Sequence, residues 1–296
     1  MPRPAAAVLL LICTMIWGFA FIAQKSAMDS MGPLTFAGIR YLLGGLVILP
    51  LALRERRRKA TPLTARQRLL IGLMCLAFFG ASWLQQLGLT LTTVTNSGFL
   101  TGLYVIFVPA IALLVLRTPP HPAVWACVPL ALVGIYYLNG GGFHSFNTGD
   151  AIIVTSAVFW ATHVLLLGHL ARSTGLPIFV SAVSFLAAGL LATGFSFVLE
   201  TPTLTGIAAG WPEIAYAGIL STAVAFTLQA IGQQYVPPAN AAIILSAESL
   251  FAALGGALLL GERLPPIGYA GAGLIFLAIL LVETIPFLMT RRLRAS

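Results

Sequence analysis

The feature that most constrains this chain is a series of apolar runs, each about twenty residues long, in which charged residues are nearly absent. Only 8% of the 296 residues are Asp, Glu, Lys or Arg, and 59% are hydrophobic, whereas soluble domains carry about 25% charged residues. Polar side chains are too few to cover a water-soluble fold of this length, so the sequence predicts an integral membrane protein. A membrane-spanning helix needs about 20 apolar residues, and ten such spans leave too few residues for a soluble domain.

Apolar runs separated by charges, Gly, Pro and Asn predict an all-α fold with ten transmembrane helices. The run that follows Arg3 is long and lacks a clear polar cleavage region, so we interpret it as the first span and not as a secretory signal. The cysteines lie inside apolar runs without metal-ligand spacing, which favours core residues over metal or disulfide sites. The predicted spans are residues 5–25, 33–53, 69–90, 94–116, 121–139, 150–170, 177–199, 212–234, 238–260 and 266–288.

Basic residues gather on one side of the predicted membrane. Seven lie between the second and third spans, and placing this connection in the cytoplasm puts thirteen of the sixteen Lys and Arg there. Lys25 and Arg263 lie on the opposite side, and Arg40 lies within a span. The excess of positive charge on one side predicts that both termini are cytoplasmic. It also accounts for the net charge of +8, so no nucleic-acid partner is expected.

The chain resembles itself when it is shifted by about 144 residues. A shift of 144 aligns Gln85 with Gln229, and a shift of 143 aligns Trp17 with Trp160. Such matches in a consistent register arise by chance much less often than apolar matches, and they indicate a duplication. Five spans per copy is an odd number, which predicts inverted repeats, an arrangement typical of transporters. The predicted repeats are residues 1–144 and 145–296.

Several short motifs point to one family. They are Trp17-Gly18-Phe19-Ala20-Phe21, Pro33 with Arg40, Pro238-Ala239-Asn240 and Gly261-Glu262-Arg263. On these motifs the chain resembles the drug/metabolite transporter superfamily, in its ten-span form of two EamA-like repeats, and most closely the bacterial aromatic amino-acid exporters. The resemblance implies a multi-pass protein of the bacterial inner membrane, as a monomer or homodimer. Arg117-Thr118-Pro119 stands where a second Gly-Glu-Arg is expected, so the two halves are not expected to be functionally equivalent.

Polar groups in hydrocarbon are costly and therefore face the protein interior or a wet cavity. Six predicted spans, the first, third, fourth, sixth, eighth and ninth, carry aromatic and polar residues that predict a substrate cavity. Large aromatic faces beside a few hydrogen-bonding groups suit an uncharged or zwitterionic amphipathic solute. The predicted aromatic walls are Trp17, Phe21, Tyr104 and Trp160. The predicted polar residues are Gln85, Asn96, Ser97, Thr101, His163, Gln229, Asn240, Ser246 and Glu248.

Some of these residues have structural alternatives. Trp17 and Trp160 could belong to an interfacial aromatic belt. Glu248 and His163 are candidates for proton coupling, and each could instead be a buried group with only a hydrogen-bonding role.

The polar residues near helix ends also have alternatives. Asn96 and Asn240 begin predicted helices, so N-capping is the role favoured for both. Arg40 could pair with Glu248 or Glu283, or could extend toward the membrane surface.

These features predict a secondary transporter that exports amino acids, aromatic and other neutral ones, or related metabolites by alternating access. The alternative is a multidrug exporter of lipophilic cations, in which Glu248 would meet the cation. Phosphorylated substrates are disfavoured because few Lys or Arg lie inside the predicted membrane. The sequence carries no phosphate loop, metal motif or nucleophile elbow, so neither an enzyme nor a cofactor is expected. Proton antiport and facilitated diffusion are both compatible with the sequence.

Overall fold

A computed structural model describes residues 1–59, 61–138, 140–141, 147–259, 261, 263 and 266–295, with residues 286–295 described by their backbone only. Helices account for the regular structure of these residues, and no strand occurs among them. The helices are α1 (Arg3–Ala27), α2 (Pro33–Arg58), α3 (Ala65–Leu91), α4 (Val94–Thr101), α5 (Tyr104–Leu114), α6 (Pro122–Leu138), α7 (Thr148–Thr174), α8 (Pro177–Leu199), α9 (Leu204–Ala209), α10 (Trp211–Ala215), the π-helix η1 (Tyr216–Phe226), α11 (Thr227–Gly232), α12 (Pro238–Leu245), α13 (Glu248–Leu259) and α14 (Pro266–Ala295).

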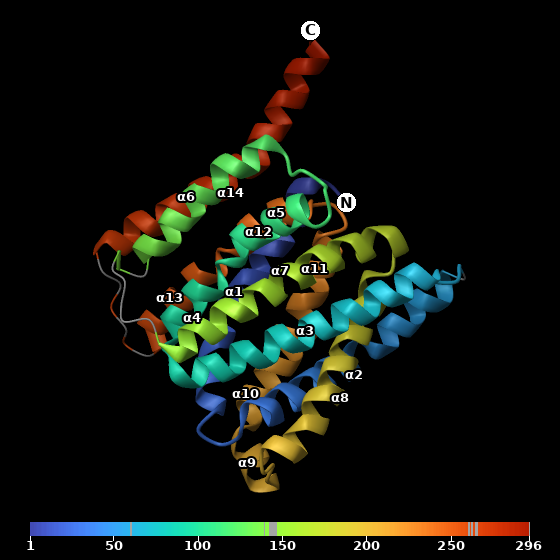
Figure 1. Ribbon diagram of the computed structural model, residues 1–296, viewed down its shortest axis with the longest axis vertical. Helices are drawn as coiled ribbons and strands as arrows, with labels where there is room; N and C mark the ends of the chain where they lie inside the picture. Colours follow the sequence, from blue (N-terminus) through green and yellow to red (C-terminus); the bar gives the residue numbers. More distant parts are fainter. Residues whose placement is uncertain are drawn as a thin grey trace.

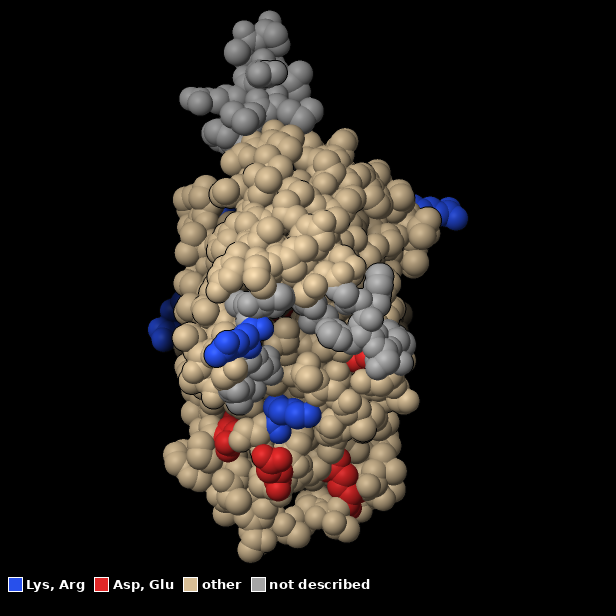
Figure 2. All heavy atoms as spheres, turned by 90° about the vertical axis from the view of Figure 1, so that its left-hand side faces the viewer, with Lys and Arg blue, Asp and Glu red and all other residues tan. Residues whose placement is uncertain are grey.

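Helical segments occupy all ten predicted ranges. Nine segments of the described chain are long and apolar enough to cross a membrane, and α6 is an apolar helix of 17 residues. Large apolar side chains such as Leu114, Phe197 and Val198 are more than 70% exposed, which a lipid environment stabilises and water does not. Figure 2 shows one face of the molecule, on which broad areas carry no charged side chain. The chain is an all-helical integral membrane protein.

Local sequence signals set where several helices begin. Proline is the first residue of α2, α8, α12 and α14, a position where its missing N–H costs nothing and its fixed φ suits the helix. In α3, Thr64 and Gln67 form a reciprocal capping box, with backbone-to-side-chain hydrogen bonds of 3.0 and 3.1 Å. The predicted starts at the four prolines agree with these signals, whereas the third span was predicted to begin at residue 69 and α3 begins at Ala65, directly after its capping residue Thr64.

Two predicted spans, 94–116 and 238–260, are each interrupted at the same point. The break between α4 and α5 is at Gly102 and Leu103, and the break between α12 and α13 is at Ser246 and Ala247. The backbone tightens there to i→i−3 hydrogen bonds, from Leu103 N to the Leu100 carbonyl and, 144 residues later, from Ala247 N to the carbonyl of residue 244. Short 3₁₀ turns within helices often mark hinges. The sequence pattern did not predict either break.

Helices α2 and α8, which the 144-residue offset makes equivalent, pack antiparallel along their length (Figure 1). Neither helix caps its own N-terminus with a side chain. The Glu200 carboxylate, just beyond α8, accepts the Leu34 and Thr35 N–H groups at 2.7 and 2.8 Å. In return, Glu55 near the end of α2 accepts the Phe179 N–H at 2.8 Å. Each helix therefore caps the other.

Helices α6 and α14 form a second antiparallel pair of equivalent helices and pack mainly on each other at one side of the bundle (Figure 1). Their backbones come close at two glycines. A Cβ added to Gly134 would lie 2.8 Å from the Gly271 carbonyl oxygen, so a larger residue would push the helices apart.

Two further groups of helices each combine one helix from one half of the chain with several helices from the other half. Helix α1 packs on η1, α11, α12 and α13 from the second half. Helix α7 packs on α3, α4 and α5 from the first half. The space between these two groups holds the candidate site described below.

The predicted span 212–234 contains an unpredicted π-helix, η1. Its wider turns change which backbone carbonyls face α1. The Ser221 carbonyl accepts the Trp17 indole N–H at 3.1 Å, and the Ala225 carbonyl accepts the Cys13 thiol at 3.0 Å. π-Helical segments are frequently found at functional sites.

Two sequence-based predictions lie outside the described residues. The predicted boundary between the repeats, at residue 144, falls within 142–146, and Glu262 of the Gly-Glu-Arg motif is likewise not described.

Candidate functional site

A cavity lies between the two helix groups, beside both helix breaks. The cavity is narrow, with a volume of about 40 Å³. Its lining combines eight aromatic or aliphatic residues with seven polar or charged ones. The lining residues are Trp17, Phe21, Gln24, Arg40, Tyr41, Gln85, Thr101, Tyr104, Trp160, Val164, Ser221, Phe226, Gln229, Leu245 and Glu248.

The structure brings together eight of the thirteen residues that the sequence analysis assigned to a cavity. These eight are Trp17, Phe21, Gln85, Thr101, Tyr104, Trp160, Gln229 and Glu248. Among the lining residues absent from that set, Gln24 and Arg40 stand out in the sequence as polar residues within apolar runs. Ser221 and Phe226 carry no such signal, because their position depends on the π-helical turn of η1.

Three of the other five predicted residues lie outside the cavity lining as buried groups. His163 packs against Phe78, with ring centroids 5.0 Å apart, and touches the outer side of Trp160 at 5.7 Å. Ser246 donates its hydroxyl to the Ile243 carbonyl at 2.7 Å, within its own helix. Ser97 is buried and its hydroxyl has no hydrogen-bond partner.

Asn96 is in the first turn of α4 but does not cap the helix. The cap is Thr93, whose hydroxyl accepts the Asn96 N–H at 3.2 Å. The Asn96 side chain instead donates to Thr92 at 2.9 Å and to Asp150 at 2.5 Å. The predicted capping role is therefore wrong for Asn96, whose amide ties the start of α4 to α7.

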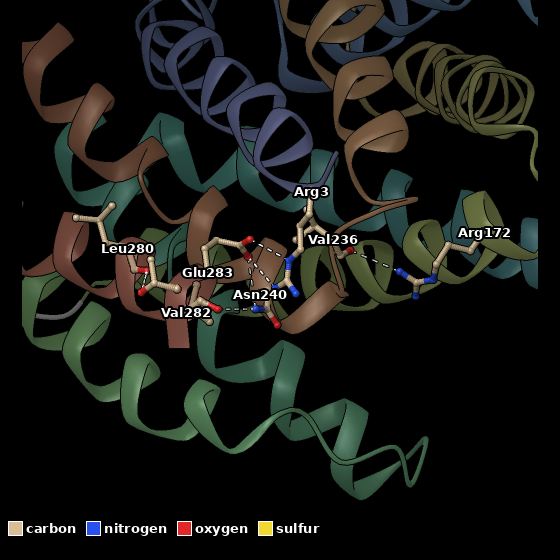
Figure 3. A network of polar contacts seen from close by, with 8 residues as sticks. Arg3, Arg172, Val236, Asn240, Leu280, Val282 and Glu283 are labelled. Carbon is tan, nitrogen blue, oxygen red and sulfur yellow. Dashed lines mark hydrogen bonds and ion pairs between the residues drawn. The ribbon is translucent and has the colours of Figure 1, made fainter. Parts of the chain in front are cut away.

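Asn240 also does not cap its helix. Pro237 occupies the position before α12, and Asn240 donates to the Val282 carbonyl at 2.9 Å in α14 (Figure 3). The capping prediction is again wrong, because residues three positions into a helix point toward neighbouring helices when those pack closely. Figure 3 also shows Glu283 paired with Arg3, at 2.9 Å between Oε2 and Nε.

Arg40 is buried in the cavity wall. Its Nη2 donates to the Tyr41 hydroxyl at 2.6 Å, and that hydroxyl donates to Ser82 at 2.7 Å. The guanidinium carbon lies 4.5 Å from the Tyr41 ring centroid and 5.1 Å from that of Phe36. Neither acidic partner considered from the sequence, Glu248 or Glu283, pairs with it, and Arg40 does not reach the surface.

Glu248 is the first residue of α13 and occupies the position equivalent to Tyr104, the first residue of α5. Both side chains are buried and line the cavity. The Tyr104 hydroxyl lies beside the Glu248 carboxyl group, and neither Tyr104 OH nor Glu248 Oε1 has a further hydrogen-bond partner. The residues that follow the two helix breaks therefore place one phenol and one carboxyl group at the same cavity.

The aromatic residues form a continuous wall. Phe226 of η1 packs against Trp17 at 4.5 Å between ring centroids and stacks on Trp160 at 5.6 Å with an interplanar angle of 15°. Both tryptophans are less than 10% exposed, so they lie in the protein interior and not in an interfacial belt.

Six polar atoms on the cavity lack hydrogen-bond partners. Leaving a buried polar group unpaired costs about 1–3 kcal/mol, and native proteins rarely tolerate it without a reason. The unpaired atoms of these lining residues are therefore candidates for hydrogen bonds with a solute or with water. They are Gln24 Oε1, Arg40 Nε, Tyr104 OH, Trp160 Nε1, Gln229 Oε1 and Glu248 Oε1.

Comparisons with known proteins relate the chain to membrane transporters. The sequence model of the EamA-like transporter family matches the chain twice, over residues 4–140 and 147–284. An uncharacterised transporter of Archaeoglobus fulgidus is 32% identical, over 93% of this chain and 84% of its own. The threonine/homoserine exporter RhtA of Escherichia coli K12 is 26% identical, over 92% of this chain and 88% of its own. A solved crystal structure with 18% identity covers 99% of both chains at a TM-score of 0.77, which shows a shared fold.

Proposed function

The chain belongs to the EamA-like transporter family and is a membrane transporter, not an enzyme; from this premise we propose that it exports neutral amino acids through the cavity between its two helix groups. The observation that carries the proposal is the set of unpaired polar atoms on an otherwise aromatic, membrane-buried cavity. A small amphipathic solute would satisfy these atoms and bury its apolar part against the rings. The proposed location is the inner membrane of a bacterium, as for the similar E. coli transporter YedA, which is named an inner membrane protein.

The proposed architecture is two inverted five-helix repeats, residues 1–144 and 145–296, with ten spans and both termini in the cytoplasm. The double family match supports the duplication. Equivalent helices α2 and α8 run antiparallel, as inverted copies would. The matching breaks in α4/α5 and α12/α13 support it further.

We propose that transport proceeds by alternating access. The two helix groups meet at the cavity, and the 3₁₀ turns at 102–103 and 246–247 lie next to it. Rocking of one group against the other, with bending at these turns, would open the cavity to one side at a time. Such a movement would also widen a cavity that is narrow in the present conformation.

Two observations favour amino acids as the substrates. The similar protein RhtA is named as an exporter of threonine and homoserine, and this chain is proposed to handle solutes of the same chemical class. The wall of Trp17, Trp160 and Phe226 supports including aromatic amino acids, because ring faces pack well against one another.

The test is transport by purified protein in liposomes loaded with labelled threonine, homoserine, phenylalanine or tryptophan, with and without a pH gradient. We expect release of at least one of these above that from protein-free liposomes. Acceleration by the gradient would indicate proton coupling, for which Glu248 is the better placed candidate because His163 lies outside the cavity lining. If none of the four amino acids is released faster than from protein-free liposomes, the proposed export of amino acids is wrong.

The alternative function is export of lipophilic cations, which aromatic rings and the Glu248 carboxyl would attract. The buried Arg40 guanidinium in the same cavity repels such cations, so we rank this function second. Glu248→Gln should abolish resistance of cells to cationic dyes if the alternative holds.

A further inference from the structure

The cavity holds one buried cation and one buried carboxyl group that do not pair with each other. Arg40 is 3% exposed and Glu248 is 5% exposed, and both line the cavity. Among the side chains that the structure describes, the ion pair is between Arg3 and Glu283, away from both. Burying a charged group without a counter-charge is strongly unfavourable. A ligand that brings an anionic group to the guanidinium and a cationic group to the carboxyl group would stabilise the charged forms of both.

The surroundings of Arg40 hold the guanidinium in place without neutralising it. Tyr41 and Phe36 flank it, and the Tyr41 hydroxyl takes one N–H. These neighbours fix the orientation of the group, but both are uncharged, and Arg40 Nε is unpaired. A planar guanidinium with free N–H donors is the preferred partner of a carboxylate. The indole N–H of Trp160 is a second unpaired donor on the cavity.

The other unpaired groups suit an ammonium. Gln229 Oε1 and Gln24 Oε1 are acceptors without a donor, the Glu248 carboxyl group has only the neighbouring Tyr104 hydroxyl, and all three residues line the cavity. An ammonium offers three donors and no acceptor. The phenol of Tyr104 lies close to Glu248 and can adjust its hydroxyl to either role.

We propose that the cavity recognises its substrate as a zwitterion, with the substrate carboxylate bound by Arg40 and the substrate ammonium bound by Glu248. The inference rests on the proposed export of amino acids and assigns the two residues that select for the α-amino acid group itself. The substrate side chain then meets the wall of Trp17, Trp160 and Phe226, which discriminates less sharply. Compounds that lack either charge leave one buried group unpaired and bind more weakly.

The experiment measures competition in liposomes, using whichever of threonine and phenylalanine the wild-type protein transports faster. The unlabelled competitors are the same amino acid, its methyl ester, which lacks the carboxylate, and its desamino acid, which lacks the ammonium. For the wild type we expect the amino acid to compete about tenfold better than either analogue.

The two charge-removing variants should respond in opposite ways. In Arg40→Gln, the preference for the amino acid over the methyl ester should fall to about one, while its preference over the desamino acid remains. In Glu248→Gln the pattern should reverse. Arg40→Lys and Glu248→Asp keep the charge and should restore part of each preference, and Arg66→Gln and Asp29→Asn, which remove exposed charges outside the cavity, should match the wild type.

Thermal stabilisation of the purified variants by each compound gives a second readout where a variant no longer transports. If both variants keep the wild-type ratios of preference, the assignment of Arg40 and Glu248 is wrong while amino-acid export stands. If the wild-type protein transports no amino acid, the proposed function fails first and the zwitterion assignment falls with it.

Discussion

The two halves of the chain place their helix breaks at equivalent positions but fill the position after each break differently. Tyr104 begins α5 in the first half, and Glu248 begins α13 in the second. The backbone course is the same in both, down to the i→i−3 hydrogen bonds. Among the described residues that line the cavity, the acidic group comes from the second half. Two equivalent helix breaks can therefore differ in chemistry, because the side chain at one position changes without a change in the course of the helix.

A second comparison concerns the ends of the third helix in each half. Lys25 donates to the carbonyls of Leu89 and Thr92, at 2.8 and 3.0 Å. Arg172 donates to the carbonyls of Gln233 and Val236, at 3.0 and 3.5 Å, and the contact with Val236 is drawn in Figure 3. The acceptors are 144 residues apart in both cases. Cations at helix C-terminal carbonyls are stabilising, and each half achieves this with a different side chain.

The largest difference in the free energy of unfolding is expected between matched substitutions in α1 and α7, the equivalent first helices of the two halves. A Cβ at Gly18 would lie only 2.6 Å from backbone atoms of Phe251 and Ala252 in α13, whereas the equivalent position in α7 already holds Ala161. Gly18→Ala should therefore destabilise the protein by about 1–3 kcal/mol through overpacking. Thermal unfolding in detergent measures this, with Ala161→Gly as the control, expected to cost about 1 kcal/mol or less. Equal losses would contradict the close approach of α1 to α13.

The next effect concerns the position after each helix break. Glu248→Gln should lower amino-acid transport about tenfold, because it replaces the carboxyl group proposed to bind the substrate ammonium. Tyr104→Phe should lower it by about threefold or less, because only the hydroxyl beside Glu248 is lost. Initial rates in liposomes at equal protein density give both values. Equal effects would mean that the halves contribute equally to the site.

The reciprocal caps of α2 and α8 should differ by a smaller amount in the free energy that each contributes to stability. Glu200 accepts three hydrogen bonds, from the Leu34 N–H and from the N–H and hydroxyl of Thr35, whereas Glu55 accepts the Phe179 N–H. Loss of a helix cap costs about 0.5–2 kcal/mol, so Glu200→Ala should lie near the upper end and Glu55→Ala near the lower end. Unfolding in a denaturant series checks the order, and the reverse order would show that the caps do not determine it.

The smallest effects are expected at the two basic residues. Lys25 is half-buried and Arg172 is exposed, so water and salt weaken the contacts of Arg172 more strongly. Lys25→Met should cost about 1 kcal/mol and Arg172→Met about 0.5 kcal/mol or less. Thermal unfolding at low and high salt tests this, since only a screened contact should lose its effect in high salt.

Much of the helical framework could be predicted because the free-energy cost of placing a residue in the membrane depends mainly on that residue alone. An apolar run of about 20 residues has no better location than hydrocarbon, and proline marks the first turn of helices such as α2, α8 and α14. The same reasoning placed Gln85, Tyr104 and Glu248 in the interior, since side chains with polar groups are costly to expose to lipid within a span. These inferences depend on residue type and spacing alone.

Tertiary structure decided what depends on neighbours that are distant in sequence. Apolar periodicity is the same for a continuous helix and for one with a 3₁₀ turn or a π-helical segment, so it did not predict the breaks or η1. Asn96 and Asn240 bond to adjacent helices because those helices lie within reach of their amides. Glu283, which the sequence offered as a counter-ion for Arg40, forms an ion pair with Arg3 instead. The packing of the helices decides which of the two arginines it meets. The sequence by itself determined that this protein spans a membrane and which residues are costly to bury there. Only the packing of the helices decided which of those residues face one another across the cavity. The physical reason is that spacing along a helix sets the direction of a side chain but not its partner.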